Sequence, residues 1–270
     1  MMPVCRYVAR LSYHLYQWEL QQPNVGEESL TDFLLWQISQ LPFVKYRKFS
    51  KREEGQQTGA DWEWWFVDRY HALGLRVQAK RLRQNGKENF RLLAHKTRHG
   101  YQIEMLINSS KKKNLLPFYV FYWPGTMKVR CRLNRGREEG AFLTTAFDIC
   151  YSPVRMCDFL RGNARQKEQA SLNSGDLLSI SNPLSCLFCC PAVEARLYTP
   201  TTALFEFIRM YWPIIDDYRE NPDQPLGLHE RPPRYIQVLL DSERIPDWFD
   251  SEYQRIIDAK AVLVYDMREW

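Results

Sequence analysis

DWEWWFVDRYHALGLRVQAK, residues 61–80, is the stretch of sequence that decides the fold of this chain. Residues 62–67 are rich in aromatic side chains, which favour strands. Residues 75–82 form a second, mostly apolar run, and the segment 68–74 between the two runs is typical of a turn. Strands joined by so short a connection pair in antiparallel fashion, so we predict a β-hairpin here.

The second strand of this hairpin carries polar residues at positions where a core strand usually carries apolar ones. Side chains alternate across a strand, so Gln78 and Lys80 share one face while Val77 and Ala79 share the other. Burying a lysine without an anionic partner is costly. Asp61 begins the preceding strand, and we expect the hairpin to bring its carboxylate to Lys80.

Outward from the hairpin, the chain predicts the order helix, three strands, helix, strand. Residues 27–41 have apolar residues at helical spacing and acids in the first turn, and Pro42 ends the helix. Residues 43–50 alternate apolar and basic side chains, as a strand does. Residues 100–110 have helical spacing, and 117–122 is an apolar run typical of a strand buried on both faces.

The two ends of the chain are expected to surround this core. Residues 1–25 favour a short helix, and 201–218 favour a longer one that Pro213 kinks. Residues 161–182 are polar and are expected to form a loop, and late strands are expected at 235–240 and 261–265. We predict three parts: an N-terminal extension (1–26), a core (27–122) and a mixed α+β C-terminal elaboration packed on the core (123–270).

Composition excludes disorder and leaves nucleic-acid binding open. Of the 270 residues, 45% are apolar and 14% aromatic, which is ample for a folded core. A net charge of +5 permits contact with nucleic acid without requiring it. The sequence has neither a signal peptide nor an apolar run long enough to cross a bilayer, so we expect a cytoplasmic protein without a membrane partner.

The seven cysteines are expected to be reduced thiols in the core, because their number is odd and their spacing irregular. A Cys₄ zinc site is the alternative. It would use Cys150, Cys157, Cys186 and Cys189. The apolar residues that flank Cys186 and Cys189 favour buried thiols instead.

Two short segments resemble a known superfamily. Gly59-Ala60-Asp61-Trp62 followed by Val77-Gln78-Ala79-Lys80 is similar to the PD-(D/E)xK nuclease motif, in the Mrr-like variant whose second acid is Gln. It is also similar to uncharacterised bacterial proteins with an acidic helix start, Gly-Ala-Asp-Trp and Gln-Ala-Lys. The resemblance covers residues 27–122. It implies an α/β fold with a restriction-endonuclease-like core: a helix, a three-stranded antiparallel meander, a helix and a strand.

The resemblance also implies roles for individual residues. Asp61 would be the central metal ligand, and Gln78 would offer a neutral carbonyl oxygen to the same ion. Lys80 would orient the attacking water and stabilise charge on the phosphate. Glu28 on the first helix, or Glu54 before Asp61, would restore the charge that the neutral Gln lacks. Oxygen ligands of this kind suit Mg²⁺ or Mn²⁺.

These roles together imply a metal-dependent endonuclease, with DNA as the expected substrate and a bacterial restriction or antiphage defence role by analogy. Gln102, on the helix after the motif, is expected to face the site, and self-association as a homodimer is a further expectation. Basic residues expected to contact nucleic-acid phosphates are Lys45, Arg47, Lys48, Lys51, Arg52 and Arg81.

Three other hypotheses remain open at this stage. The same fold could serve as a non-catalytic module that binds nucleic acid or protein. The Asp61–Lys80 pair could merely neutralise a buried charge within a hairpin. A hydrolase of another class could use Asp148, Asp158 or Glu206 in the C-terminal half, although these acids show no paired spacing.

Overall fold

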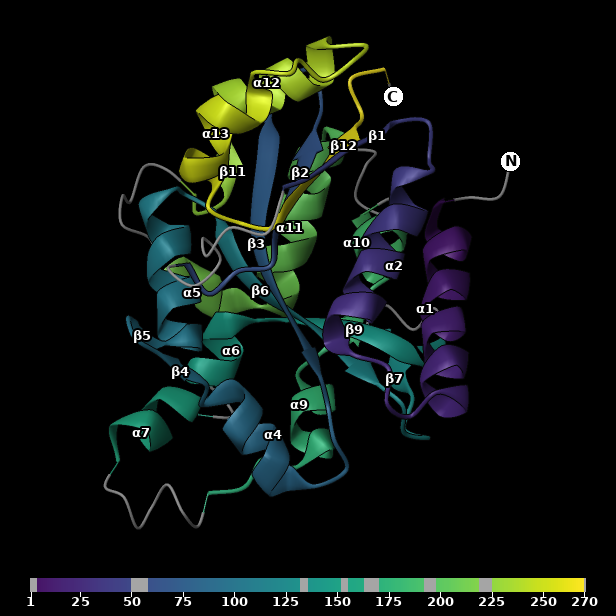
Figure 1. Cartoon of the computed structure of the whole chain (residues 1–270), viewed down its shortest axis with the longest axis vertical. Helices are drawn as coiled ribbons and strands as arrows, with labels where there is room; N and C mark the ends of the chain where they lie inside the picture. Colours follow the sequence, from purple (N-terminus) through teal and green to yellow (C-terminus); the bar gives the residue numbers. More distant parts are fainter. Residues whose placement is uncertain are drawn as a thin grey trace.

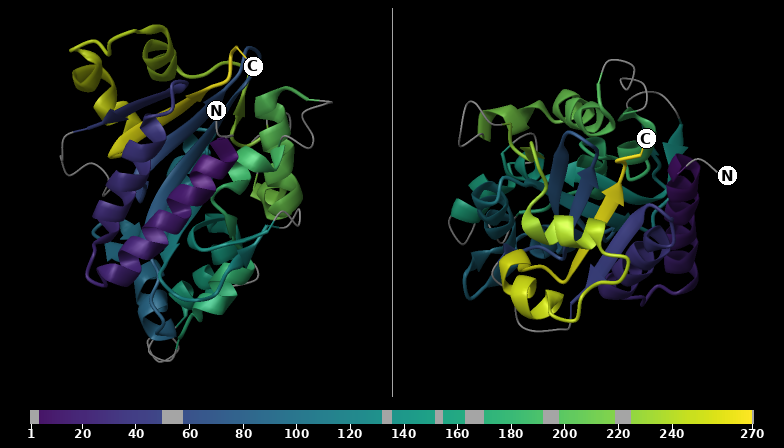
Figure 2. Two further views of the ribbon diagram at one scale, coloured as in Figure 1. Left: turned by 90° about the vertical axis from the view of Figure 1, so that its right-hand side faces the viewer. Right: turned by 90° about the horizontal axis from the view of Figure 1, so that it is seen from above.

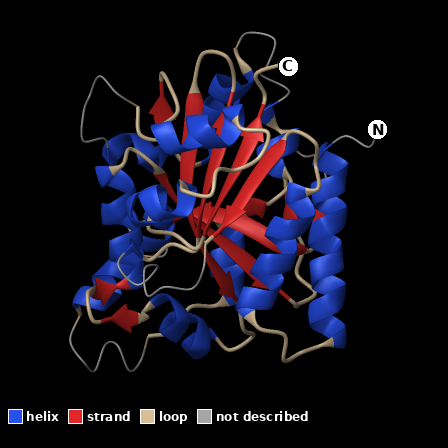
Figure 3. Cartoon of the chain, turned by 45° about the horizontal axis from the view of Figure 1, so that its top comes forward, coloured by secondary structure: helices blue, strands red, loops and turns tan. Residues whose placement is uncertain are grey.

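The computed structural model describes residues 4–49, 58–131, 136–151, 155–162, 170–191, 198–218 and 225–269. It is a mixed α/β fold, in which helices pack on both faces of a central twisted sheet (Figures 1 and 3). The order along the sheet is β1 (Val44–Lys48), β12 (Ala261–Asp266), β2 (Trp62–Val67), β3 (Ala72–Arg81), β6 (Leu116–Trp123), β9 (Gly140–Thr145) and β10 (Asn182–Pro183), with β11 (Leu228–His229) paired to β3.

The remaining elements surround this sheet. Two small hairpins pair β4 (Lys96–Thr97) with β5 (Gly100–Tyr101) and β7 (Val129–Arg130) with β8 (Arg137–Glu138). The helices are α1 (Val4–Gln21), α2 (Glu27–Ser39), α4 (Gly86–Leu93), α5 (Gln102–Lys112), α6 (Ala146–Cys150), α7 (Met156–Arg161), α9 (Ser174–Ser179), α10 (Cys186–Cys189), α11 (Pro200–Tyr211), the 3₁₀ helix η2 (Pro213–Tyr218), α12 (Arg234–Asp241) and α13 (Phe249–Ile257).

The predicted hairpin is confirmed. β2 and β3 pair in antiparallel fashion, with Trp62 opposite Val77, and every residue of both strands is buried. β3 begins at Ala72, three residues before the expected start, because Ala72 and Leu73 continue the pairing with Val67 and Phe66.

The predicted three-stranded meander is wrong at its first strand. β1 pairs with β12, and β12 lies parallel to β2, so a strand from the end of the chain separates β1 from β2. The sequence of β12, AVLVYD, is apolar at five successive positions. Such a strand needs cover on both faces and strand neighbours on both sides, which the position between β1 and β2 provides. Residues 27–122 and 123–270 therefore contribute strands to one sheet.

The two faces of the sheet carry different clusters of buried side chains. Trp62, Trp64 and Phe66 belong to the larger cluster, together with apolar residues of α1, α2 and α11. Trp65 and Val67 point to the other face, where α12 and α13 cover them. Figure 2 shows α12 and α13 packed together at one end of the sheet, well separated from α1.

Three of the predicted helices form, and one predicted strand does not. The helices expected at 27–41, 100–110 and 201–218 form at Glu27–Ser39, Gln102–Lys112 and Pro200–Tyr211, and a 3₁₀ helix starting at Pro213 follows the last of them. The expected strand 235–240 is wrong because these residues form α12. The residues of α12 that are buried, Tyr235, Ile236, Leu239 and Leu240, follow helical spacing.

Other outcomes concern the ends of the chain and the polar segment. The short helix expected in residues 1–25 is confirmed as α1. The expected loop 161–182 lies partly outside the described residues, and within it α9 forms. Among the described residues, no helix is long and apolar enough to cross a membrane.

The expectation that all seven cysteines are thiols is wrong for four of them. The structure joins Cys5 to Cys189 and Cys150 to Cys157 as disulfides. Cys131, Cys186 and Cys190 are buried thiols. The alternative Cys₄ zinc site does not form, because Cys150 and Cys157 pair with each other while Cys189 pairs with the N-terminal helix.

A buried ion pair fastens α12 and α13 to the sheet. Arg76 of β3 and Glu63 of β2 have fully buried side chains, and Arg76 Nη2 lies 2.7 Å from Glu63 Oε1. The Tyr235 hydroxyl of α12 donates to Glu63 Oε2 at 2.6 Å. Arg76 also donates to the carbonyl oxygen of Ile257, at the end of α13.

We predict that Glu63→Gln lowers the free energy of unfolding by about 3–5 kcal/mol, because it leaves the buried Arg76 guanidinium without a compensating charge. Urea unfolding followed by circular dichroism measures the change. Arg155→Ala is the control, since it breaks an exposed pair with Asp158 and should cost at most about 0.5 kcal/mol. Equal losses in the two variants would show that the buried pair does not carry this stability.

Candidate active site

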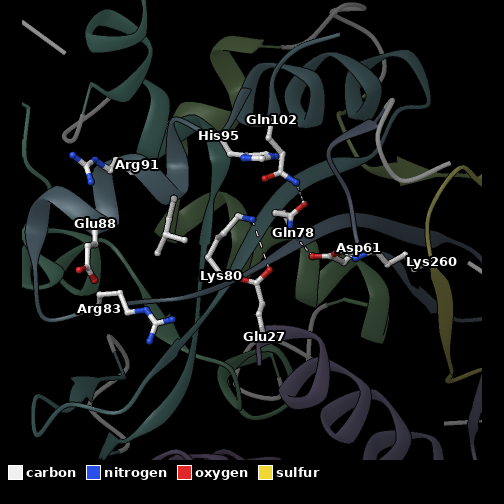
Figure 4. A pocket seen from close by; sticks show the side chains of 11 residues that line it. Glu27, Asp61, Gln78, Lys80, Arg83, Glu88, Arg91, His95, Gln102 and Lys260 are labelled. Carbon is white, nitrogen blue, oxygen red and sulfur yellow. Dashed lines mark hydrogen bonds and ion pairs between the residues drawn. The ribbon is translucent and has the colours of Figure 1, made fainter. Parts of the chain in front are cut away.

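A polar pocket opens beside the end of β3 and the start of β2. Its volume is about 490 Å³. Figure 4 shows its side chains converging from the hairpin, the start of α2, α4, α5 and the residue before β12. The lining residues are Glu27, Asp61, Gln78, Lys80, Arg83, Glu88, Arg91, Leu92, His95, Gln102 and Lys260.

Asp61 directly precedes β2 and is held there by a backbone hydrogen bond to β3. Its N–H donates to the carbonyl oxygen of Val77 at 2.8 Å, which extends the β2–β3 ladder by one residue. Its carboxylate oxygen Oδ2 accepts from the backbone N–H of Ala79 at 2.9 Å and from the side chain of Gln78. Asp61 and Gln78 are therefore in direct contact, a contact that the sequence analysis did not predict.

Gly59 lets the chain turn into this position. It has φ of 71°, and a Cβ built on it would lie 2.4 Å from the carbonyl oxygen of Gln102. Only glycine combines that backbone conformation with so close an approach. The Gly-Ala-Asp turn thus runs close to the backbone of α5 at Gly59, two residues before Asp61.

The side-chain amide of Gln78 lies between Asp61 on one side and Gln102 on the other. Its Nε2 faces Asp61 Oδ2 and the carbonyl oxygen of Ala79, at 2.9 Å from the latter. Its Oε1 accepts from Gln102 Nε2 at 2.7 Å, while Gln102 Oε1 is buried without a partner. Amide orientation is assigned by hydrogen bonding. Turning both amides over would pair Gln102 Oε1 and direct the oxygen of Gln78 toward Asp61 and Ala79.

Two cations neutralise the acids of the pocket. Lys80 Nζ lies 3.7 Å from Glu27 Oε1, and Lys260 Nζ lies 2.7 Å from Asp61 Oδ1. The expected Asp61–Lys80 pair is wrong, because Lys260 meets Asp61 and Lys80 meets the first turn of α2. The hypothesis of a self-neutralising hairpin fails for the same reason.

Glu27 is the acid of α2 that lines the pocket. Its Oε2 accepts from the backbone N–H of Arg81 at 3.0 Å, so it is tied to the end of β3. Burial raises the pKa of Glu27, while the charge of Lys80 opposes this rise and that of Asp61 adds to it. The sequence analysis named Glu28 instead. Glu28 is exposed, lies outside the pocket lining and places Oε1 3.7 Å from Lys260 Nζ.

The basic residues expected to bind phosphates lie elsewhere. On β1, Lys48 pairs with Asp32, Arg47 pairs with Asp250, and Lys45 donates to a backbone carbonyl oxygen. These three do not line the pocket, and their role in substrate binding stays a prediction. Glu54, Lys51 and Arg52 lie outside the residues that the structure describes.

The expectation for Arg81 is wrong. Its side chain is buried on the face opposite Lys80, where Nε donates to Glu19 Oε1 at 2.7 Å. Strand alternation sends residues 80 and 81 to opposite faces, so the run Lys80-Arg81 is not one basic patch. Burial raises the pKa of Glu19 to about 7, although Arg81 opposes the rise.

Several pocket residues were missed by sequence reasoning. Lys260 directly precedes the predicted strand 261–265, and its charge gives no local signal of a contact 199 residues away. Exposed Arg83, Arg91 and His95 come from β3's end and α4, a helix that the sequence analysis did not predict. Gln102 faces the site as expected.

The three acids considered as the site of a different class of hydrolase each bond to a residue three positions away in the sequence. Asp158 pairs with Arg155 on α7, and Glu206 pairs with Arg209 on α11. Asp148 bonds to Thr145 at the start of α6. None of the three lines the pocket at Asp61.

The fold and this pocket define a mixed α/β protein with a carboxylate–amide–lysine site on a buried hairpin. The chain belongs to a family of unknown function, DUF6615, whose model matches residues 4–269. No curated protein and no solved structure matches the chain.

We predict that Lys260→Met raises the affinity for Mn²⁺ about fivefold, because the ammonium group competes with a metal ion for Asp61. The partly exposed pair limits the gain to about 1 kcal/mol. Isothermal titration calorimetry measures it. Lys128→Met is the matched control, as Lys128 is similarly exposed in a pair with Glu139 outside the pocket. Weaker binding by Lys260→Met would contradict competition.

We predict that Glu27→Gln weakens Mn²⁺ binding about tenfold at pH 8 and flattens its pH dependence. In the wild type, the affinity for Mn²⁺ should fall as the pH is lowered through the raised pKa of Glu27. Protonation neutralises this carboxylate, which then no longer attracts the metal ion. Titrations at pH 6, 7 and 8 measure this. Glu28→Gln is the neighbouring control, and an equal effect of that variant would show that the loss is not specific to Glu27.

Proposed function

We propose that the protein is a metal-dependent nuclease that hydrolyses phosphodiester bonds, with a restriction-endonuclease-like core built on β2 and β3. The observation that carries the proposal is the contact of Asp61 with Gln78 and the backbone of Ala79, with Lys80 in the same pocket. Acid, amide and lysine thus occur together in space, on adjacent strands and in the order that the PD-(D/E)xK motif requires.

The donor set fits Mg²⁺ or Mn²⁺. Asp61 Oδ2 and the carbonyl oxygen of Ala79 already face one point, now filled by the amide group of Gln78. The buried, unpartnered Oε1 of Gln102 would gain a partner if both amides turned over, which would also direct the oxygen of Gln78 to that point. Hard oxygen donors of this kind suit these ions. When bound, the metal would activate water and offset charge at the scissile phosphate.

The side chains around these donors have separable tasks. Lys80 is largely buried, so its ammonium can orient a water molecule and neutralise charge that develops on a phosphate oxygen. Glu27 holds Lys80 in place and adds the negative charge that the neutral Gln78 lacks. Arg83, Arg91 and His95 lie at the exposed side of the pocket, where they would contact the backbone of a nucleic acid.

DNA is the substrate we propose, with defence against foreign DNA as the setting and a homodimer as the working assembly. These finer points rest on the resemblance to restriction-type nucleases. A non-catalytic binding module is the second candidate function. The contact of Lys260 with Asp61 favours it, since an internal cation there satisfies the carboxylate without metal.

A cleavage assay tests the proposal. Wild-type protein with Mg²⁺ or Mn²⁺ should cut at least one of plasmid, linear duplex, single-stranded DNA and RNA. Asp61→Asn and Lys80→Ala should each reduce the rate roughly 100-fold or more, because each removes a group that acts on the reacting phosphate. EDTA should abolish cleavage.

Asp158→Asn is the control for the cleavage assay, because Asp158 is an exposed acid outside the pocket. It should cut at the wild-type rate. Binding without cleavage by the wild type, on every substrate and with either metal, would overturn the nuclease and favour the binding module. Full activity of Lys80→Ala would place the active site elsewhere.

A further inference from the structure

Three buried thiols converge outside the pocket at Asp61. Cys131 follows β7, and Cys186 and Cys190 lie one helical turn apart at α10. Their sulfur atoms all lie within 4.8 Å of one another, and Sγ of Cys131 is 3.4 Å from Sγ of Cys190. All three residues are at most 4% exposed. The sequence analysis singled out Cys186 but gave it other partners.

The spacing of the three sulfurs matches what a thiolate-bound metal needs. Zinc–sulfur bonds are about 2.3 Å long, so sulfurs at two corners of a tetrahedral site lie about 3.8 Å apart. A trigonal ion would hold its sulfurs about 4 Å apart. The 3.4 Å separation of Cys131 Sγ from Cys190 Sγ lies slightly below both values, and all three sulfurs lie within 4.8 Å of one another, so a metal ion requires small side-chain shifts only.

The elements that carry the thiols are fixed independently of them. The backbone N–H of Cys131 donates to the carbonyl oxygen of Gly136 at 2.9 Å, which continues the β7–β8 pairing. At α10, the N–H of Cys190 donates to the carbonyl oxygen of Cys186 at 3.2 Å. The helical turn sets the i, i+4 spacing that places Cys186 and Cys190 on one face. The backbone thus directs three sulfurs at one point.

We propose that Cys131, Cys186 and Cys190 form a structural site for one thiophilic d¹⁰ metal ion, Zn²⁺ or Cu⁺. Soft thiolate donors select these ions over Mg²⁺ or Mn²⁺. The ion joins the β7–β8 hairpin to α10, which packs on α1. The site is separate from the pocket at Asp61, so neither proposal depends on the other.

Cobalt substitution and metal analysis test the site. The full chain is purified under reducing conditions in the Asp61→Asn background, so that the carboxylate pocket does not add a metal signal. We expect about one Zn²⁺ or Cu⁺ per chain by mass spectrometry of the metal. Adding Co²⁺ to the chelated protein should give an intense near-ultraviolet thiolate-to-cobalt absorption band. Anaerobic Cu⁺ titration against a chromogenic chelator distinguishes the two native ions.

Single variants assign the ligands. Cys131→Ser, Cys186→Ser and Cys190→Ser should each lose the cobalt band and at least tenfold in metal affinity. Cys157→Ser is the control: it removes a buried sulfur outside the cluster, together with the Cys150–Cys157 disulfide, and should keep both. Metal removal from the unmutated thiols should lower Tm by about 5 °C or more, a measurement that needs no ligand variant.

Three results would overturn the site. The first is folded protein that binds no metal and gives no cobalt band. The second is a band that survives in all three ligand variants. The third is a Cys131–Cys190 disulfide in the protein purified under reducing conditions, because that bond would remove two of the proposed ligands.

Discussion

The register of the β2–β3 hairpin is the constraint on which the rest of the structure depends. With Trp62 opposite Val77, Glu63 faces Arg76, and Asp61 meets the backbone and side chains at the end of β3. A slip by one residue would send every one of these side chains to the other face. One register thus fixes both the buried ion pair that holds α12 and α13 and the carboxylate–amide contact of the pocket.

The polar residues of this face form a continuous row with a gradient of exposure. Glu63 and Arg76 are fully buried and neutralise each other, whereas Gln78 and Lys80 lie nearer the end of the strand, where the pocket opens. A charged side chain in the fully buried part of this row needs an oppositely charged partner within the protein. A charge at the open end can exchange partners with solvent or a ligand, so the proposed chemistry would be confined to the last residues of β3.

The end of the chain completes the site. β12 enters between β1 and β2, and the residue before it, Lys260, reaches Asp61. The pocket therefore includes a contact between residues 199 positions apart in the chain. The charge balance of the pocket depends on two distant parts of the chain. Glu27 is the first residue of α2, and Lys260 directly precedes β12.

The sequence by itself determined the hairpin, the helices at its flanks and the position of Asp61 near the end of the Gln-Ala-Lys strand, because strand alternation and helical spacing are local properties of a few residues. It indicated an acid in the first turn of α2, but local spacing did not distinguish Glu27 from Glu28. Only the tertiary structure decided that β12 splits the expected meander, that 235–240 is helical and that Lys80 meets Glu27. The physical reason is that these features depend on contacts between segments far apart in the chain. A local sequence pattern does not identify the partner in such a contact.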